Sequence, residues 1–277
     1  MKKRLMCLSI AAIVMFCTLN VATASTGNYP PTFHNNARHT GDHIPMARGS
    51  TLNGTLNWNY VTEGILHSSS ATPNGIVYIG DGDHNVYALN ARTGAKVWNY
   101  TTGDFVWSSP TVANGIVYVG SADHNVYALN ARTGAKVWNY TTGDMVHSSP
   151  TVDNGIVYVG SLDHNVYALN ARTGAKVWSY TTGYWVVSCP AVANGIVYVG
   201  SNDHNVYALN ARTGAKVWSY TTGNWVHSSP AVANGIVYVG SLDHNVYALN
   251  ARTGKLVWSY TTGNPVRSSP TVASRIG

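Results

Sequence analysis

Short runs of apolar residues recur along most of the chain, separated by polar segments rich in Gly, Asn, Asp and Ser. The run at 116–120 places Ile116 and Tyr118 on one side of a predicted strand. Val117 and Val119 lie on its other side. Because a strand with two apolar faces is typical of a sheet that is covered on both sides, the pattern predicts sheets packed against other sheets.

Each recurrence of the pattern contains four predicted strands that are bounded by turn residues. In one unit the strands cover residues 108–112, 116–120, 125–130 and 136–141. Every connection between them is short, so we expect consecutive hairpins within a single sheet.

The pattern returns every 40 residues, and tryptophans mark the period. They are Trp58, Trp98, Trp138, Trp178, Trp218 and Trp258. Five units are complete, and a sixth is split between the two ends of the array. Four-stranded units at this period predict an all-β fold, a β-propeller with five complete blades and a partial sixth. Each tryptophan is expected to pack between neighbouring blades.

The two ends of the array leave two interpretations open. Residues 55–62 match the last strand of a unit, and residues 268–273 match the first strand. Either the sequence is a fragment of a longer protein, or both ends share one blade and close the ring.

The sequence ALNARTGAKVW at 128–138 resembles the tryptophan-docking motif of the PQQ-like (pyrroloquinoline-quinone-type) propeller repeats. Ala128, the pair Thr133-Gly134 and Trp138 carry the resemblance, which covers about residues 55–273. Asn130 departs from the motif, since the family usually has Asp there. The resemblance implies a propeller domain over 55–277, preceded by an irregular lead-in at 25–54.

Residues 1–24 have the pattern of a secretory signal peptide. Lys2, Lys3 and Arg4 precede an apolar stretch, and Ala22-Thr23-Ala24 resembles a cleavage site. We therefore expect an extracytoplasmic protein, secreted, periplasmic or on the cell surface, without a transmembrane span after cleavage. An uncleaved anchor is the alternative. Cleavage would leave Cys189 as a single cysteine, which cannot form an internal disulfide.

Charge argues against a nucleic-acid partner. The formal net charge is +6. Lys2, Lys3 and Arg4 supply three of these charges, so 6 − 3 leaves +3 once the first segment is removed. This charge is too weak and too evenly spread for nucleic-acid binding.

The PQQ-like family includes quinoprotein dehydrogenases and outer-membrane assembly proteins, and a fold does not choose between them. The dehydrogenases have a pair of adjacent cysteines and acidic ligands for calcium. This chain has no adjacent cysteines, and its only glutamate is Glu63. We therefore expect no enzymatic activity and no cofactor. The preferred hypothesis is a binding or scaffold propeller for a protein, peptide or surface polymer. The alternatives are a PQQ-dependent dehydrogenase-like protein and an outer-membrane assembly factor-like subunit.

Differences between the units concentrate in two places. One is the segment before each first strand, such as 104–107, and the other is the residue before each Asp-His pair. Both connections are expected at the same end of the blades, so their variation suggests a binding surface. Drift in tolerant loops is the alternative. The candidate ligand-binding residues are His67, Trp107, His147, Trp185, Trp225, His227 and Arg267.

Histidines at this surface raise two further possibilities. His67, His147 and His227 lie in alternate units, but a propeller channel is expected to hold them too far apart for one metal ion, so no metal site is predicted. Pairs such as Asp123-His124 occur in five copies. Because a catalytic site needs one copy, these pairs are expected to stabilise hairpin turns instead.

Overall fold

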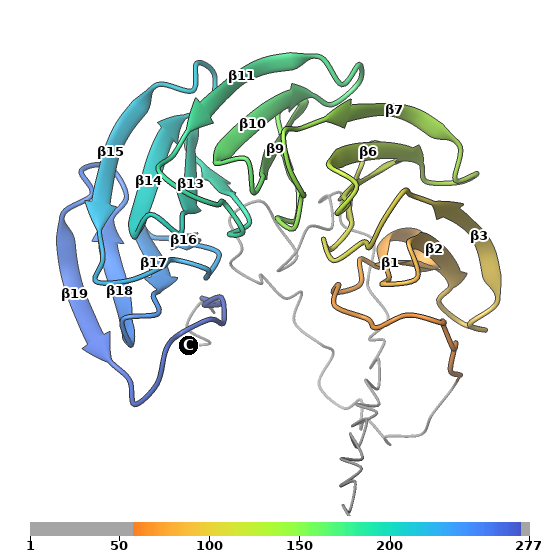
Figure 1. The fold of residues 1–277 in the computed structure, drawn as a ribbon, viewed down its shortest axis with the longest axis horizontal. Helices are drawn as coiled ribbons and strands as arrows, with labels where there is room; N and C mark the ends of the chain where they lie inside the picture. The colour runs from red at the N-terminus through yellow and green to blue at the C-terminus, as the bar shows by residue number, and fades with distance from the viewer. Residues whose placement is uncertain (1–57, 273–277) are drawn as a thin grey trace, which may run out of the picture.

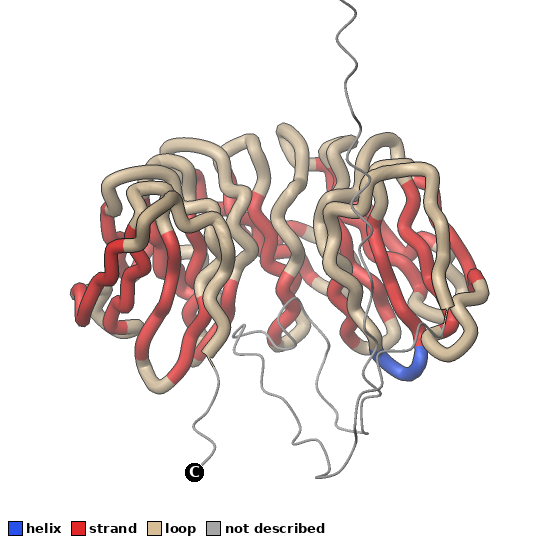
Figure 2. Tube along the Cα trace, turned by 90° about the horizontal axis from the view of Figure 1, so that it is seen from below, coloured by secondary structure: helices blue, strands red, loops and turns tan. Residues whose placement is uncertain are grey.

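The computed structural model describes residues 58–272. Within them, five antiparallel sheets follow an arc, with β1–β3 at one end and β16–β19 at the other (Figure 1). The strands occupy the middle of the disc, and the turns gather at its two ends (Figure 2). The predicted all-β architecture of repeated sheets is therefore confirmed.

The five sheets, called blades 1 to 5 in chain order, share one strand order from the inside of the arc to its rim. The short inner strands are β4 (Thr111–Ala113), β8 (Thr151–Asp153), β12 (Ala191–Ala193) and β16 (Ala231–Ala233). The second strands are β1 (Ile76–Gly80), β5 (Ile116–Gly120), β9 (Ile156–Gly160), β13 (Ile196–Gly200) and β17 (Ile236–Gly240).

The third and fourth strands complete each blade toward the rim. The third strands are β2 (Asn85–Asn90), β6 (Asn125–Asn130), β10 (Asn165–Asn170), β14 (Asn205–Asn210) and β18 (Asn245–Asn250). The fourth strands are β3 (Lys96–Thr101), β7 (Lys136–Thr141), β11 (Lys176–Thr181), β15 (Lys216–Thr221) and β19 (Leu256–Thr261). Blade 1 has three strands, a short 3-10 turn η2 (Pro73–Gly75), and an isolated bridge between Ala71 and Tyr78 at the place of the inner strand.

The inner strands start later than predicted, because the serines before them bond elsewhere. The backbone N–H of Gly120 donates to the Ser108 hydroxyl (3.0 Å), and the N–H of Ser109 donates to Ser149 of the next blade (2.9 Å). Pro110 has no N–H to pair. The strand therefore begins at Thr111 and not at residue 108.

The tryptophans join neighbouring blades as the sequence predicts. The indole N–H of Trp138 in β7 donates to the carbonyl of Ala171 in the next blade (3.0 Å). The hydroxyl of Tyr118 in β5 donates to the same carbonyl (3.0 Å). Trp138 is buried. One carbonyl thus satisfies two polar groups that would be costly to bury unpaired.

The Thr-Gly pair of the motif makes room for this contact. Gly174 has a φ of 73°, a conformation that favours glycine. A Cβ there would lie 2.8 Å from the Trp138 ring. The amide oxygen of Asn170 accepts the backbone N–H of Arg172 and Thr173 at 3.0 Å each. Asn thus supplies the acceptor for the turn at the position where the family usually has Asp.

The strand predicted at 55–62 is not formed in its described part, 58–62. No described strand lies beside this segment to share a ladder of hydrogen bonds. Its side chains still dock as in the complete units, because the Trp58 indole donates to Ala91 (2.9 Å) and the Tyr60 ring lies 5.7 Å from the Tyr87 ring. The expected signal segment and the lead-in at 25–54 lie outside the described residues.

Candidate functional site

The variable segments lie across the turns of two blades. In the segment 144–147, the N–H of Val146 donates to Ser121 of blade 2 (3.1 Å). The carbonyl of Met145 accepts the N–H of Leu162 in blade 3 (2.9 Å). Equivalent bonds recur along the arc. The variable segments and the Asp-His turns therefore lie at one end of the blades, which we call the variable face.

One residue anchors each variable segment. Val146 is fully buried, and a Cβ on Gly120 would lie 2.4 Å from its side chain. A valine occupies the same third place in the five segments from 104–107 to 264–267, and Leu66 takes that place in 64–67, while the first, second and fourth places differ. The scaffold of the variable face is thus constant, and its outward side chains are free to change.

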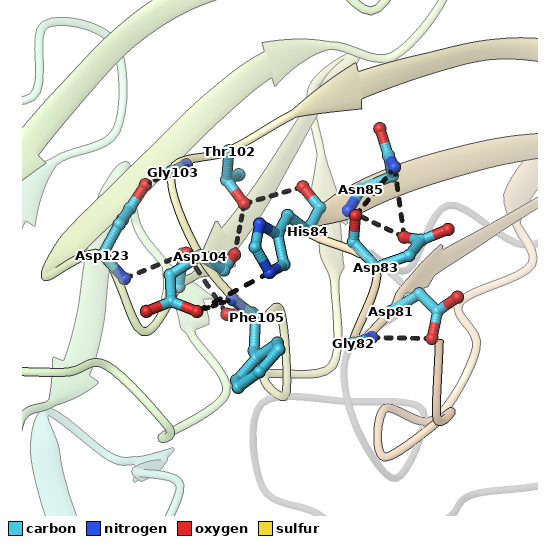
Figure 3. A network of polar contacts seen from close by, with 11 residues as sticks. Asp81, Gly82, Asp83, His84, Asn85, Thr102, Gly103, Asp104, Phe105 and Asp123 are labelled. Atoms are coloured by element: carbon cyan, nitrogen blue, oxygen red, sulfur yellow. Dashed lines mark hydrogen bonds and ion pairs between the residues drawn. The ribbon is translucent and has the colours of Figure 1, made fainter. Parts of the chain in front are cut away.

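Polar contacts hold the segment 102–105 from both sides (Figure 3). The hydroxyl of Thr102 lies within hydrogen-bond distance of two carbonyl oxygens, those of His84 (2.8 Å) and Asp104 (2.7 Å). The N–H of Gly103 donates to the carboxylate of Asp123 in the next blade (2.7 Å). The His84 Nε2 atom lies 3.8 Å from the Asp104 Oδ1 atom.

The Asp-His pairs have a structural role, as predicted. The Asp123 carboxylate accepts the Tyr127 hydroxyl (2.6 Å) and the Asn125 N–H (3.0 Å) in addition to Gly103. Burial acts to raise the pKa of Asp123, but these hydrogen bonds outweigh burial and lower the pKa from its ordinary value. The sequence reasoning did not foresee that this carboxylate also links two blades. Its presence in every repeat was the available signal.

The candidate residues of blades 1 and 2 form a first aromatic cluster. The Trp107 ring lies 5.4 Å from the His67 ring, 4.7 Å from the His147 ring and 5.4 Å from the Phe105 ring, measured between centroids. Phe105 is exposed, and its ring is nearly parallel to that of Trp107. The structure thus brings together three of the predicted site residues and adds Phe105.

Blades 3 to 5 carry a second aromatic cluster. The Tyr184 ring lies 4.9 Å from the Trp185 ring and 6.4 Å from the Trp225 ring, with an interplanar angle of 28° in both pairs. Trp225 stacks on His227 at 5.7 Å and 16°. Three predicted site residues therefore meet here, together with Tyr184. The remaining candidate, Arg267, is exposed near the end of the described chain.

Burial lowers the pKa of two histidines of these clusters. It lowers the pKa of His147, against the raising influence of the Asp144 charge. Burial and the positive charge of Arg267 both lower the pKa of His227. The Nε2 atoms of His147 and His227 are buried without a hydrogen-bond partner. A neutral imidazole nitrogen can donate or accept, depending on its tautomer.

The Trp107 ring contacts both His67 and His147. Among residues 58–272 there is no group of three or more His, Cys, Asp or Glu side chains that could hold a metal ion.

The second variable position is buried in four of the five units. Ala122, Leu162, Asn202 and Leu242, which precede the Asp-His pairs, are buried, and Gly82 is partly exposed. This position therefore adds little to the exposed surface of the variable face. The backbone N–H of this residue donates to a carbonyl of the adjacent variable segment. For example, the N–H of Asn202 donates to the Trp185 carbonyl (2.9 Å).

A protein-family model described as outer membrane protein assembly factor BamB matches residues 47–184, 126–224 and 204–276. These matches cover most of the chain and coincide with the repeats. The chain belongs to this family. Among curated proteins no relative matches the sequence.

Solved structures of BamB-type and quinoprotein propellers have a similar fold. BamB from Moraxella catarrhalis is 20% identical, with a TM-score of 0.55 over 79% of this chain and 83% of that chain. Quinohemoprotein alcohol dehydrogenase ADHIIG from Pseudomonas putida HK5 is 20% identical, with a TM-score of 0.71 over 83% of this chain and 47% of that chain. The enzyme from Comamonas testosteroni is 19% identical, with a TM-score of 0.72 over 83% and 48%.

These likenesses establish the fold and leave the activity open. The family member described here spans about half the length of the two dehydrogenases. At such low identity a shared fold does not transfer a site. In the described part of the chain, no helix has the length and apolar character needed to span a membrane.

Proposed function

We propose that this BamB-type propeller is a non-catalytic binding module that presents its variable face to a protein, a peptide or a surface polymer. The blades form a rigid support, since each is tied to the next by indole, tyrosine and aspartate hydrogen bonds. The recognition residues are the two aromatic clusters.

One observation carries the proposal: exposed aromatic side chains gather on segments that differ strongly between the repeats. Phe105, Tyr184 and Trp225 are each exposed and each stack on a neighbouring ring. Aromatic rings with an apolar face are enriched where proteins bind partners. Random drift in a solvent-exposed loop would favour small polar residues over large stacked rings.

The setting we propose is extracytoplasmic. The pattern of residues 1–24 and the description of the matching family both support it. By analogy with an assembly factor, a protein is one of the partners that this proposal includes.

We also propose that the protein is not a quinone-dependent enzyme. The lack of adjacent cysteines in the sequence and its single glutamate, Glu63, support this view. The test is to incubate the purified full chain with pyrroloquinoline quinone and calcium and to record quinone absorbance after desalting. Retained quinone together with alcohol oxidation would overturn this part of the proposal.

A matched pair of variants tests the binding role. The face variant changes three exposed aromatics to serine: Phe105→Ser, Tyr184→Ser and Trp225→Ser. The control variant changes three exposed arginines in the turns at the opposite end of the blades: Arg132→Ser, Arg172→Ser and Arg212→Ser. Each protein is immobilised and exposed to proteins and polymers from the native cell envelope, and retained material is quantified.

The expected result is loss of specific retention by the face variant and its preservation in the control variant. Circular dichroism must show that both variants keep the wild-type fold. Equal retention by wild type and face variant would overturn the proposal, because the variable segments would then be tolerant loops.

A further inference from the structure

The second aromatic cluster differs from the first in shape and charge. Its rings Tyr184, Trp185, Trp225 and His227 form a run of nearly parallel faces that crosses two connections between blades. The variable segments that follow blades 1 and 2 begin with the acidic residues Asp104 and Asp144. Here they open with Tyr184 and Asn224.

A residue with an unpaired polar atom lies between the segments that carry these rings. Asn202 is only 3% exposed, and its side-chain oxygen is buried without a hydrogen-bond partner. The Asn202 N–H donates to the Trp185 carbonyl, and the carbonyl of the neighbouring Ser201 accepts the N–H of Val226. Asn202 is therefore placed between the segments that carry Trp185 and Trp225.

Burying an acceptor without a partner is unfavourable, because the acceptor loses its hydrogen bonds to water and gains none in the protein. The other complete blades avoid this cost with apolar residues at the same place, Ala122, Leu162 and Leu242. The fold thus does not require a polar residue there. A ligand that donates a hydrogen bond to Asn202 would recover the cost, and the unpaired Nε2 of His227 offers a second polar contact close to the same rings.

Taken with the proposed function, on which it rests, this geometry points to an uncharged oligosaccharide as the ligand of the second aromatic cluster. The C–H face of a sugar ring stacks on Trp225 or Tyr184, because C–H groups carry slight positive charge and an aromatic face is negative. Sugar hydroxyls supply the donor that Asn202 lacks. Because the Asn202 oxygen is buried, the proposal requires a side chain of the cluster to shift when the sugar binds.

A proline-rich peptide is the main competitor, since it also docks on aromatic grooves. Proline has no N–H. A polyproline segment therefore brings carbonyl acceptors to Asn202 and leaves the Asn202 oxygen unpaired. The unpaired acceptor favours a ligand rich in hydroxyl donors.

The test uses the full chain with three uncharged probes, cellohexaose, mannohexaose and N-acetylated chitohexaose, and with decaproline as the competing class. Binding is followed by isothermal titration calorimetry and by intrinsic tryptophan fluorescence. We expect saturable binding of at least one hexasaccharide. Trp225→Ala should weaken it about tenfold or more, a loss typical of a central aromatic contact.

Two further variants separate recognition from folding. Asn202→Leu installs the residue that blades 3 and 5 already carry at this place, so it should fold at least as stably as wild type and still weaken binding several-fold. Arg172→Ser, in an exposed turn at the opposite end of the blades, should leave hexasaccharide binding unchanged.

Failure to bind any of the three hexasaccharides would overturn the inference, as would binding of decaproline alone or wild-type affinity in Asn202→Leu. If no hexasaccharide binds but the face variant still retains less cell-envelope material than wild type, the proposed binding role stands and only the ligand class is wrong. If neither experiment shows binding, both proposals fall.

Discussion

The interfaces between blades and the outward face of blade 5 carry the same residues in different surroundings. Trp218 in β15 is 8% exposed, and its indole donates to Ala251 of blade 5 (2.9 Å). Trp258, at the same place in β19, is 45% exposed. Its neighbour Tyr260 is exposed as well, whereas the equivalent Tyr220 packs 5.5 Å from the Tyr247 ring.

This contrast separates what the strand itself provides from what the next blade adds. β19 pairs with β18 in the same register that β15 adopts with β14. The local sheet therefore forms without a cover. The burial of the indole, its hydrogen bond and the ring contact all depend on the neighbouring blade. Stability in this protein is accordingly a property of interfaces between repeats as much as of the repeats.

The largest expected effect comes from removing a docked indole. Trp178→Ala should lower the free energy of unfolding by about 3–5 kcal/mol, because it empties a packed site and leaves the Ala211 carbonyl with one donor fewer. Urea denaturation followed by circular dichroism measures the change. Trp258→Ala is the matched control and should cost about 1 kcal/mol or less. Equal losses in the two variants would contradict the contrast between covered and uncovered faces.

Glycine at the docking turn should give the next largest effect. Gly174→Ala adds a Cβ about where the Trp138 ring lies, on a backbone of φ 73°. We expect a loss of about 2–3 kcal/mol, which combines the strained φ with displacement of the indole. Gly155→Ala shares the positive φ but meets no atom within 4 Å, so thermal or urea unfolding should show only about 1 kcal/mol there. A similar loss of stability in both variants would mean that the Trp138 indole can shift to accommodate the added Cβ.

Acid should weaken the links between blades through Asp123. Its pKa is lowered in the folded protein, so its contribution is complete above the ordinary aspartate pKa and is lost as pH falls through the lower folded value. Asp123→Asn should therefore be less stable than wild type at neutral pH, and the difference should shrink as the pH falls below about 4. Urea midpoints across this range test it, with Asp153→Asn as a control, since the Asp153 carboxylate accepts a hydrogen bond from its neighbour Asn154. A difference that stays constant with pH would refute the role of the carboxylate charge.

The smallest effect concerns a chain of contacts along the inside of the arc. The N–H of Ser109 donates to the Ser149 hydroxyl, whereas the N–H of Ser149 donates to the weaker sulfur acceptor of Cys189 (3.1 Å). Cys189→Ser should raise the free energy of unfolding by about 0.5 kcal/mol. Ser149→Cys should lower it by a similar amount. Denaturation of both single variants would reveal whether the thiol is equivalent to the hydroxyls, in which case neither midpoint would move.

The blades could be predicted from the sequence because the same pattern recurs in every unit. The 40-residue period, the turn residues and the tryptophans are each visible without coordinates. Boundaries were less certain where a polar side chain competes with the ladder, as at Ser108, whose hydroxyl takes the N–H of Gly120. The sequence predicts a strand at 55–62, but a strand also needs a partner beside it, and the described part of this segment, 58–62, forms none.

The candidate site could be predicted only in part, because some of its features depend on contacts between segments. The variable segments were evident from comparison of the units, and with them Trp107, Trp225 and His227. The burial of Asn202 was not evident, because a turn position does not reveal which segment crosses above it. The stacking of Tyr184 on both Trp185 and Trp225 depends on two consecutive connections that meet only in the folded arc.

By itself the sequence determined the all-β repeat, its period, the docking motif and the segments that vary. These follow from local patterns that each unit carries within about forty residues. Only the tertiary structure decided which tryptophans are covered, which variable residues face outward and how the rings divide into two clusters. Those properties depend on the neighbouring blade, and a contact between blades cannot be read from the residues of one blade alone.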